Sequence, residues 1–305
     1  MAAYIIRRIL ALIPIWIGVY FIAFVLVHAI PGGPFDTGAI RSRQATENLL
    51  HAYHLDKPLF EQYILYIWQV LHGDLGQSMV NRGLSVSAVI KGRFPTSAEL
   101  GAAALAVSLC VGIPAGIISA ARRNSWLDHL VMFTATAGYA IPNFVFALVL
   151  ILVFGLSLHL LPLGGWGTLS DVPLPAIALG LPWAGLVARM TRASMLEALN
   201  RDYMRTAYAK GLSPFAALMR HAFRNALIPL TTLVALLAAE VITGSLIIEN
   251  IFGIPGIGHY MVDSILGADY TMTLGFIMFY ATTIFIANFL VDLSYGWIDP
   301  RIRLA

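Results

Sequence analysis

The sequence predicts an all-α protein that crosses a membrane six times. Of the 305 residues, 59% are hydrophobic and only 11% are charged, whereas a soluble domain carries about a quarter charged residues. The apolar residues gather in runs close to the ~20 residues that a helix needs to cross the hydrocarbon core. The basic residues lie beside these runs without interleaved aromatic residues, so nothing indicates nucleic-acid binding. The single cysteine, Cys110, excludes an internal disulfide.

Each apolar run is assigned one span. The six runs are about Ile9–Ile30, Leu100–Ala121, Leu130–Leu161, Leu174–Ala188, Ala226–Ile248 and Met272–Tyr295. The first exceeds the apolar core of about 7–15 residues that marks a signal peptide, so we expect an uncleaved helix. The third is interrupted by Ile-Pro-Asn at Ile141–Asn143, which leaves open one kinked helix or two short ones. The fourth is weak, because it contains Pro175 and Pro182.

The distribution of Lys and Arg predicts the orientation. With six spans both termini share a side, and 13 of the 19 basic residues lie on that side. The short loops on the other side, Pro162–Pro173 and Asn250–Thr271, contain neither Lys nor Arg. Because basic residues in short loops stay in the cytoplasm, we expect both termini to be cytoplasmic.

Three parts follow along the chain. Residues 1–30 form an N-terminal transmembrane helix, and residues 31–96 form an extracytoplasmic loop with short helices. Residues 97–305 form a core of five spans that includes a cytoplasmic loop, residues 191–225. In the outer loop we expect Tyr63, Tyr66 and Trp68 to pack locally, to rest at the membrane interface or to contact substrate.

The cytoplasmic loop is basic and organised, which sets it apart from the apolar runs. Residues Thr191–Lys210 lack Gly and Pro and favour one helix, which Gly211 would end as a C′ glycine. Ser213 before Pro214 is a typical start of a second helix. Two uses fit such an amphipathic element: contact with anionic lipid headgroups, or docking into a groove of a soluble partner.

Several motifs resemble the peptide-permease branch of ATP-binding-cassette (ABC) importer permeases. The segment "DYMRTAYAKGL", followed by "RHAFRNALIP", is similar to the cytoplasmic EAA-type loop of that family. Agreement extends over nearly the whole chain, through "YIIRRILALIPI", "HAIPGGPF", "YHLDKPLFEQYILYIWQVLHGDLGQS", "RFPTSAELG", "ARMTRASMLEAL", "GSLIIENIFGIPGIG" and "NFLVDLSYGWIDPRIR". Tyr208 departs from the family pattern, which commonly has Arg there. "PGGPF" and the short Leu161–Pro175 loop favour the oligopeptide over the dipeptide subunit.

The resemblance implies a type I ABC importer permease fold in a bacterial inner membrane. The loop would then be the coupling helix that docks on a cytoplasmic ATPase subunit, and the residues that match the motif are Arg205, Thr206, Ala207, Lys210 and Gly211. The implied partners are a second homologous permease, two ATP-binding subunits that hold ATP and Mg²⁺, and an extracytoplasmic substrate-binding protein. We expect the small Ala207 and Ala209 to allow close approach to the ATPase.

The chain itself is predicted to be neither an enzyme nor a metalloprotein. It contains no G-x-x-x-x-G-K-[ST] phosphate loop, so ATP hydrolysis falls to the partners and the chain needs no cofactor. His51 and His54 have helical spacing, but no third metal ligand is evident. Glu240 in the fifth run and Asn143 in the third are the candidate residues that line the translocation pathway. The alternative is an autonomous secondary transporter or channel in which Glu240 binds the coupling ion.

Overall fold

The computed structural model is helical, and it describes residues 2–30, 33–35, 43–81, 83–242 and 245–298. It divides into two compact units. Unit 1 consists of residues 1–96 and 255–305, and unit 2 consists of residues 97–254, so the division falls within one long helix. In the described part of the chain no strand forms, and the only β-bridge joins Gln77 to Ser85. The predicted all-α fold is confirmed.

In the described residues, five helical segments are long and apolar enough to span a membrane, and a bent pair makes a sixth if its two helices form one span. The pair consists of α5 (Trp126–Ala140) and the following helix from Asn143 to Ser157, bent by 103° at the predicted Ile-Pro-Asn break. Of the two alternatives for the third run, the structure therefore has two short helices. Pro142 precedes the first turn of α6 (Asn143–Leu150), where its ring fixes φ and its missing N–H costs no hydrogen bond.

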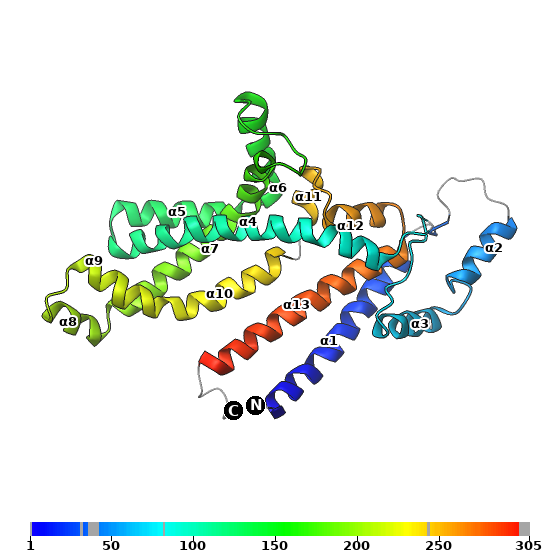
Figure 1. Cartoon of the computed structure of the whole chain (residues 1–305), viewed down its shortest axis with the longest axis horizontal. Coiled ribbons are helices and arrows are strands. Elements are labelled where there is room, and N and C mark those ends of the chain that lie inside the picture. The colour runs from blue at the N-terminus through cyan, green and yellow to red at the C-terminus, as the bar shows by residue number, and fades with distance from the viewer. Residues whose placement is uncertain (1, 31–32, 36–42, 82, 243–244, 299–305) are drawn as a thin grey trace. The chain divides into compact units, whose positions relative to one another are not determined.

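Unit 1 is built around two packed helices, α1 (Ala2–His28) and α13 (Tyr270–Ile298) (Figure 1). Around their ends lie α2 (Arg43–Ala52), α3 (Leu59–Leu71), the first part of α4 (Val86–Ala121) and α12 (Ile257–Leu266). Asp269 fixes the start of α13. Its carboxylate accepts hydrogen bonds from the backbone N–H groups of Met272 and Met79, each at 3.1 Å, and from the Ser78 hydroxyl.

The aromatic residues of α3 separate into an inner and an outer set. The ring of Tyr20 from α1 stacks on Tyr63 and Tyr66, with ring centroids 5.0 and 5.4 Å apart. Trp68 is 63% exposed, and its ring lies against His72, with ring centroids 4.4 Å apart. Of the roles expected for these residues, local packing is therefore the one that the structure shows for Tyr63 and Tyr66.

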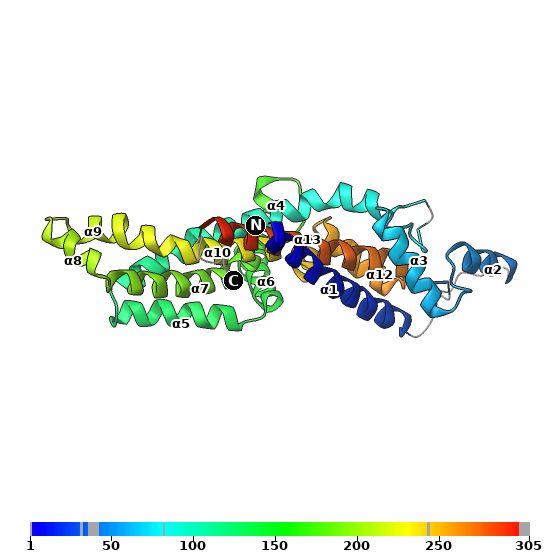
Figure 2. The ribbon, with the colours of Figure 1, turned by 90° about the horizontal axis from the view of Figure 1, so that it is seen from below.

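Unit 2 packs the second part of α4, α5, α6, α7 (Pro173–Leu199), α10 (Arg224–Ile242) and α11 (Leu246–Ile251) (Figures 1 and 2). Small residues bring its helices close together. A Cβ added at Gly112 of α4 would lie 2.6 Å from the Ala184 carbonyl oxygen of α7. One at Gly101 would lie 2.5 Å from the Val241 carbonyl oxygen of α10. Such close backbone approach is typical of helix packing in membranes, where burial of apolar surface does not drive association.

Several helix ends differ from those expected. The predicted single helix Thr191–Lys210 is wrong, because α7 ends at Leu199 and the backbone of Arg201 is extended, with φ −82° and ψ 150°. The predicted fifth span, Ala226–Ile248, is also wrong at its end. There α10 stops at Ile242, and Ser245 accepts a hydrogen bond from the Ile248 N–H as the N-cap of α11.

Candidate functional site

The segment that follows α7 forms a compact helical turn at one tip of unit 2. It consists of α8 (Asp202–Ala209), α9 (Pro214–Ala217) and a π-helical turn, η3 (Leu218–Phe223), which continues into α10. Both views of the ribbon place α8 and α9 at this tip (Figures 1 and 2). We call residues 202–215 the knob.

The knob is held by its own apolar core. Met204 and Ala207 from α8 are buried in a cluster with Met195 of α7 and Ala120 of α4. Ala207 is only 4% exposed, and its small side chain lets α8 lie close to this chain's own helices. Ala209 is exposed, as close approach by a partner requires.

Gly211 makes the turn between α8 and α9. The Leu212 N–H donates to the Ala207 carbonyl at 3.3 Å, and the Gly211 N–H donates to the Tyr208 carbonyl at 2.9 Å. Gly211 itself has φ +81°, which glycine adopts without the clash that a Cβ produces. Ser213 then caps α9 by accepting a hydrogen bond from the Ala216 N–H at 3.3 Å. The predicted glycine end and serine start of the two helices are confirmed.

The outward face of the knob combines charge with exposed rings. The Arg205 side chain is 87% exposed and lies 3.7 Å from the Asp202 carboxylate, which is 95% exposed, so the pair contributes little stability in water. Lys210 and Thr206 are exposed beside it. Phe215 is 73% exposed and lies outside the buried cluster. The exposed residues of the knob thus include cations and apolar area, the two kinds of contact that protein interfaces use.

A buried ion pair supports the base of the knob. Asp128, in the first turn of α5, is 1% exposed, and the Arg192 guanidinium of α7 donates two hydrogen bonds to its carboxylate, each at 2.7 Å. The Ser119 hydroxyl of α4 and the Asn124 N–H, at 2.9 Å, donate to the same carboxylate. Three helices are thereby joined next to the cluster on which the knob rests.

Sequence reasoning missed this ion pair, although a signal for it was present. Ser125 and Asp128 form an S-x-x-D pattern, which is typical of a helix N-terminus. The Ser125 hydroxyl does accept a hydrogen bond from the Asp128 N–H, at 3.3 Å. The pattern alone does not show that Arg192, 64 residues further along, completes the pair.

The two candidate pathway residues lie on different elements of unit 2. Asn143 is the first residue of α6 and half-buried, directly after the 103° bend. Glu240 is exposed in the last turn of α10, close to its end at Ile242, and not midway along a span. His51, the candidate metal ligand, has its Nδ1 atom 2.8 Å from the Asp56 carboxylate.

Fold and site together define a class, a helical membrane protein with an exposed helical turn at one tip of unit 2. Two family models cover nearly the whole chain. The model described as "Binding-protein-dependent transport system inner membrane component" matches residues 112–304. Its N-terminal companion, "Binding-prot-dependent transport system membrane comp, N-term", matches residues 1–101. The chain belongs to the binding-protein-dependent transport system inner membrane component family.

Curated relatives extend this result over full length. The dipeptide transport system permease protein DppB of Bacillus subtilis (strain 168) is 42% identical over 304 residues, covering 100% of this chain and 99% of that protein. The oligopeptide transport system permease protein OppB of Escherichia coli (strain K12) is 38% identical, covering 99% and 100%. DppB of the same E. coli strain is 37% identical, covering 99% of each. The resemblance to peptide-type ABC importer permeases is confirmed, and the chain is a membrane subunit and not the ATPase.

Proposed function

We propose that this chain forms half of a translocation pathway for peptides in an ATP-driven importer. A second homologous permease forms the other half, two cytoplasmic ATP-binding subunits hold ATP and Mg²⁺ and supply the energy, and an extracytoplasmic protein delivers the substrate. The peptide class is supported by relatives named for dipeptides and for oligopeptides. The oligopeptide preference expected from the short Leu161–Pro175 loop stays a prediction, because the relatives carry both names.

The knob is proposed as the element on which an ATPase subunit acts. The observation that carries this proposal is its construction: the knob exposes Arg205, Lys210 and Phe215 and is anchored by a buried core. ATP-driven closure must bias the membrane helices between two states by several kcal/mol, which requires a rigid attachment. Met204 and Ala207 supply that attachment by anchoring α8 to α7 and α4.

The orientation proposal places the knob in the cytoplasm. In unit 2 the Arg122–Arg123 turn after α4 lies at the same end as the knob, since Ala120 shares its buried cluster. At the other end, Gly164 lies in the loop before α7, where an added Cβ would be 2.5 Å from the Phe252 carbonyl oxygen. That loop, Pro162–Pro173, has no Lys or Arg. The positive-inside rule then puts the knob, and with an even number of spans both termini, in the cytoplasm.

The alternative of an autonomous carrier based on Glu240 is disfavoured by membership of a binding-protein-dependent family. Reconstitution distinguishes an importer subunit from an autonomous carrier. This chain alone in proteoliposomes is expected to give no peptide uptake, and uptake is expected once both permeases, the ATPases and the binding protein are present. Uptake by the single polypeptide would support the carrier.

The docking role is tested by reversing the charge of Arg205. Arg205→Glu should reduce peptide uptake and binding-protein-stimulated ATP hydrolysis roughly tenfold or more, because an interface charge pair of about 1.4 kcal/mol is worth that factor. The amount of the chain in the membrane and its thermal stability should not change. Lys91→Glu, at an exposed position of α4 in unit 1, is the matched control and should transport normally. Normal uptake by Arg205→Glu would contradict the docking role.

A further inference from the structure

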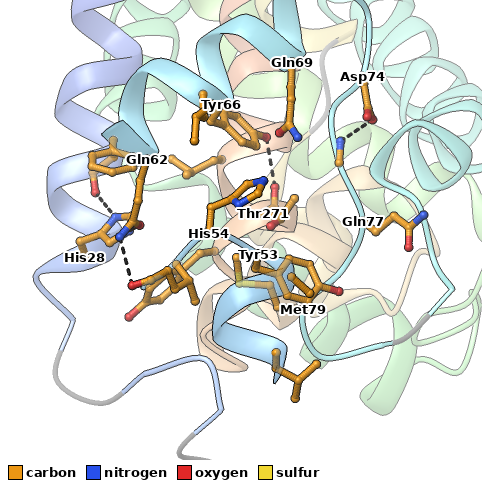
Figure 3. Close-up of a pocket in the computed structure, with 18 of the residues that line it drawn as sticks. His28, Tyr53, His54, Gln62, Tyr66, Gln69, Asp74, Gln77, Met79 and Thr271 are labelled. Carbon is orange, nitrogen blue, oxygen red and sulfur yellow. Dashed lines mark hydrogen bonds between the residues drawn. The ribbon is translucent and has the colours of Figure 1, made fainter. Parts of the chain in front are cut away.

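Unit 1 contains a pocket that the docking account does not use. Its volume is about 510 Å³, within the range of small-molecule sites. Its walls come from α1, α2, α3, the segment after α3 and the first turns of α13 (Figure 3). All of the lining residues belong to unit 1, so this unit alone shapes the pocket.

Hydrogen bonds within the walls fix their shape. His28 Nδ1 lies 2.8 Å from the Phe24 carbonyl oxygen, and the Gln62 side chain donates to the Lys57 carbonyl at 2.7 Å. The Tyr66 hydroxyl donates to the carbonyl oxygens of Leu75 and Thr271 at 3.2 and 3.4 Å. Burial, and then the nearby carboxylates of Asp74 and Asp269, raise the pKa of Tyr66, so its phenol keeps the proton that these bonds need. A preformed pocket loses little order on binding a ligand.

Three polar side chains at the pocket keep hydrogen-bonding capacity. Within the described residues, the side chains of His54 and Gln69 make no hydrogen bond, and Figure 3 shows both directed into the pocket. Asp74 uses only Oδ1, which accepts from the Gly76 N–H at 2.9 Å. His54 also has φ +57°, a conformation that is costly for a residue with a Cβ and recurs at functional sites.

The chemistry of the lining selects a class of ligand. Asp74 is the one acid, and no Lys or Arg occurs, among the described lining residues. The rings of Phe24 and Tyr270 line the pocket and add π-systems that favour a cation, whereas the ring of Tyr20 is already stacked on Tyr63 and Tyr66. The amide of Gln69 and the ring of His54 can each bond a peptide group. A ligand with an ammonium group next to an amide and an apolar side chain matches the acid, the aromatic rings and the two peptide-bonding side chains.

We propose that this pocket binds the amino end of a short peptide, with the α-ammonium on Asp74. The first peptide bond pairs with Gln69 and His54, and the first side chain lies against Phe24, Met79 and Leu274. This inference rests on the proposed function, because a peptide importer is exposed to such ligands. It adds a substrate contact in unit 1, outside both the knob and the candidate pathway residues Asn143 and Glu240.

The test uses the assembled importer, with both permeases and ATPases in lipid nanodiscs and without the binding protein. The probes are the dipeptide Phe-Ala with a free amino group and its N-acetylated form, titrated by calorimetry. We expect the free form to bind at least tenfold more tightly. Asp74→Asn should weaken its binding at least tenfold, whereas Glu61→Gln, at an exposed acid of α3 that does not line the pocket, should not change it.

The His54→Gly variant tests whether weaker peptide binding could result from loss of folding. Glycine adopts φ +57° without strain, so the variant should be at least as heat-stable as the natural chain and still bind Phe-Ala at least threefold more weakly. Equal binding of the free and acetylated forms, no detectable binding, or unchanged affinity in both variants would overturn the inference. Peptide uptake with the binding protein is measured in parallel. Normal uptake without binding at the pocket removes only this inference, whereas absence of peptide uptake removes the proposed function.

Discussion

The guanidinium of Arg192 donates two hydrogen bonds, each 2.7 Å long, to the two carboxylate oxygens of Asp128. The carboxylate is 99% removed from solvent, while the Arg192 side chain is 26% exposed. The pair joins α5 to α7 beside the cluster that carries the knob. It therefore fixes the position of α5 relative to α7 as well as stabilising the fold. A bidentate arginine restricts orientation in a way that a lysine does not.

Removing only one partner of this pair should be costly. Arg192→Met leaves a buried carboxylate without its cation and should destabilise the chain by about 3–5 kcal/mol. Adding Asp128→Asn should recover part of this loss, since the amide oxygen can still accept from the Asn124 N–H. Thermal unfolding in detergent measures both. Arg201→Met, which breaks an exposed pair with Glu197, is the control and should change stability by less than about 1 kcal/mol. Similar losses in the single variants of both pairs would contradict the account.

The Gly211→Ala variant should show whether the turn of the knob matters for transport beyond its effect on folding stability. Gly211 and Gly73 have nearly equal φ values, +81° and +80°, and an added Cβ would meet no atom within 4 Å at either position. Each alanine variant should therefore lose about 1–2 kcal/mol from backbone strain. Only Gly211→Ala should also reduce ATP-driven uptake, because only its turn presents the docking face. Equal uptake by the two variants would argue against that face.

Close packing of α4 on α7 should be sensitive to one methyl group. Gly112→Ala forces a Cβ to within 2.6 Å of the Ala184 carbonyl oxygen, so a helix must shift, at a cost of about 1–3 kcal/mol. Gly138→Ala in α5 is the matched control, since its Cβ meets nothing within 4 Å and φ is not positive there. The control should be neutral or stabilise by up to about 1 kcal/mol. Unfolding temperatures that rank the two variants in the reverse order would contradict the packing described for unit 2.

Trp68 should report lipid contact by α3. It belongs to an exposed apolar set on that helix, together with Phe60, Ile64 and Leu71. A surface of this kind is rarely left in water, and tryptophan favours the membrane interface. In a variant with Trp68 as the only tryptophan, brominated lipids should quench its fluorescence strongly. Quenching by aqueous iodide alone would place α3 away from the bilayer.

Hydropathy located the membrane-crossing segments but not the ends of the helices. The second span was expected to begin at Leu100, yet α4 begins at Val86, because a helix continues beyond the bilayer without an apolar signal. The end of α10 at Ile242 was missed for the opposite reason: apolar residues resume in α11. The break at Arg201 was not predicted, because the residues around it all tolerate a helix. The break instead depends on the tertiary packing of Met204 and Ala207.

The candidate sites differed in how far the sequence could reveal them. The turn of the knob depends on local chemistry at Gly211 and Ser213, so its caps were predicted from neighbouring residues alone. The peptide pocket combines residues as distant as Tyr20 and Leu274, and no local pattern brings such positions together. The inward direction of Ala207 likewise depends on the cluster with Met195, which only the folded chain shows.

Site-specific photocrosslinking at position 215 would show whether an ATPase subunit lies against the knob. Phe215 on the knob and Phe60 on α3 are the same residue type with nearly equal exposure, 73% and 74%. A benzophenone side chain is placed at each position in the importer assembled in native membranes. We expect position 215 to capture an ATPase subunit and position 60 to capture none. Capture of the binding protein or of lipid alone at position 215, with no ATPase product, would contradict the docking role of the knob.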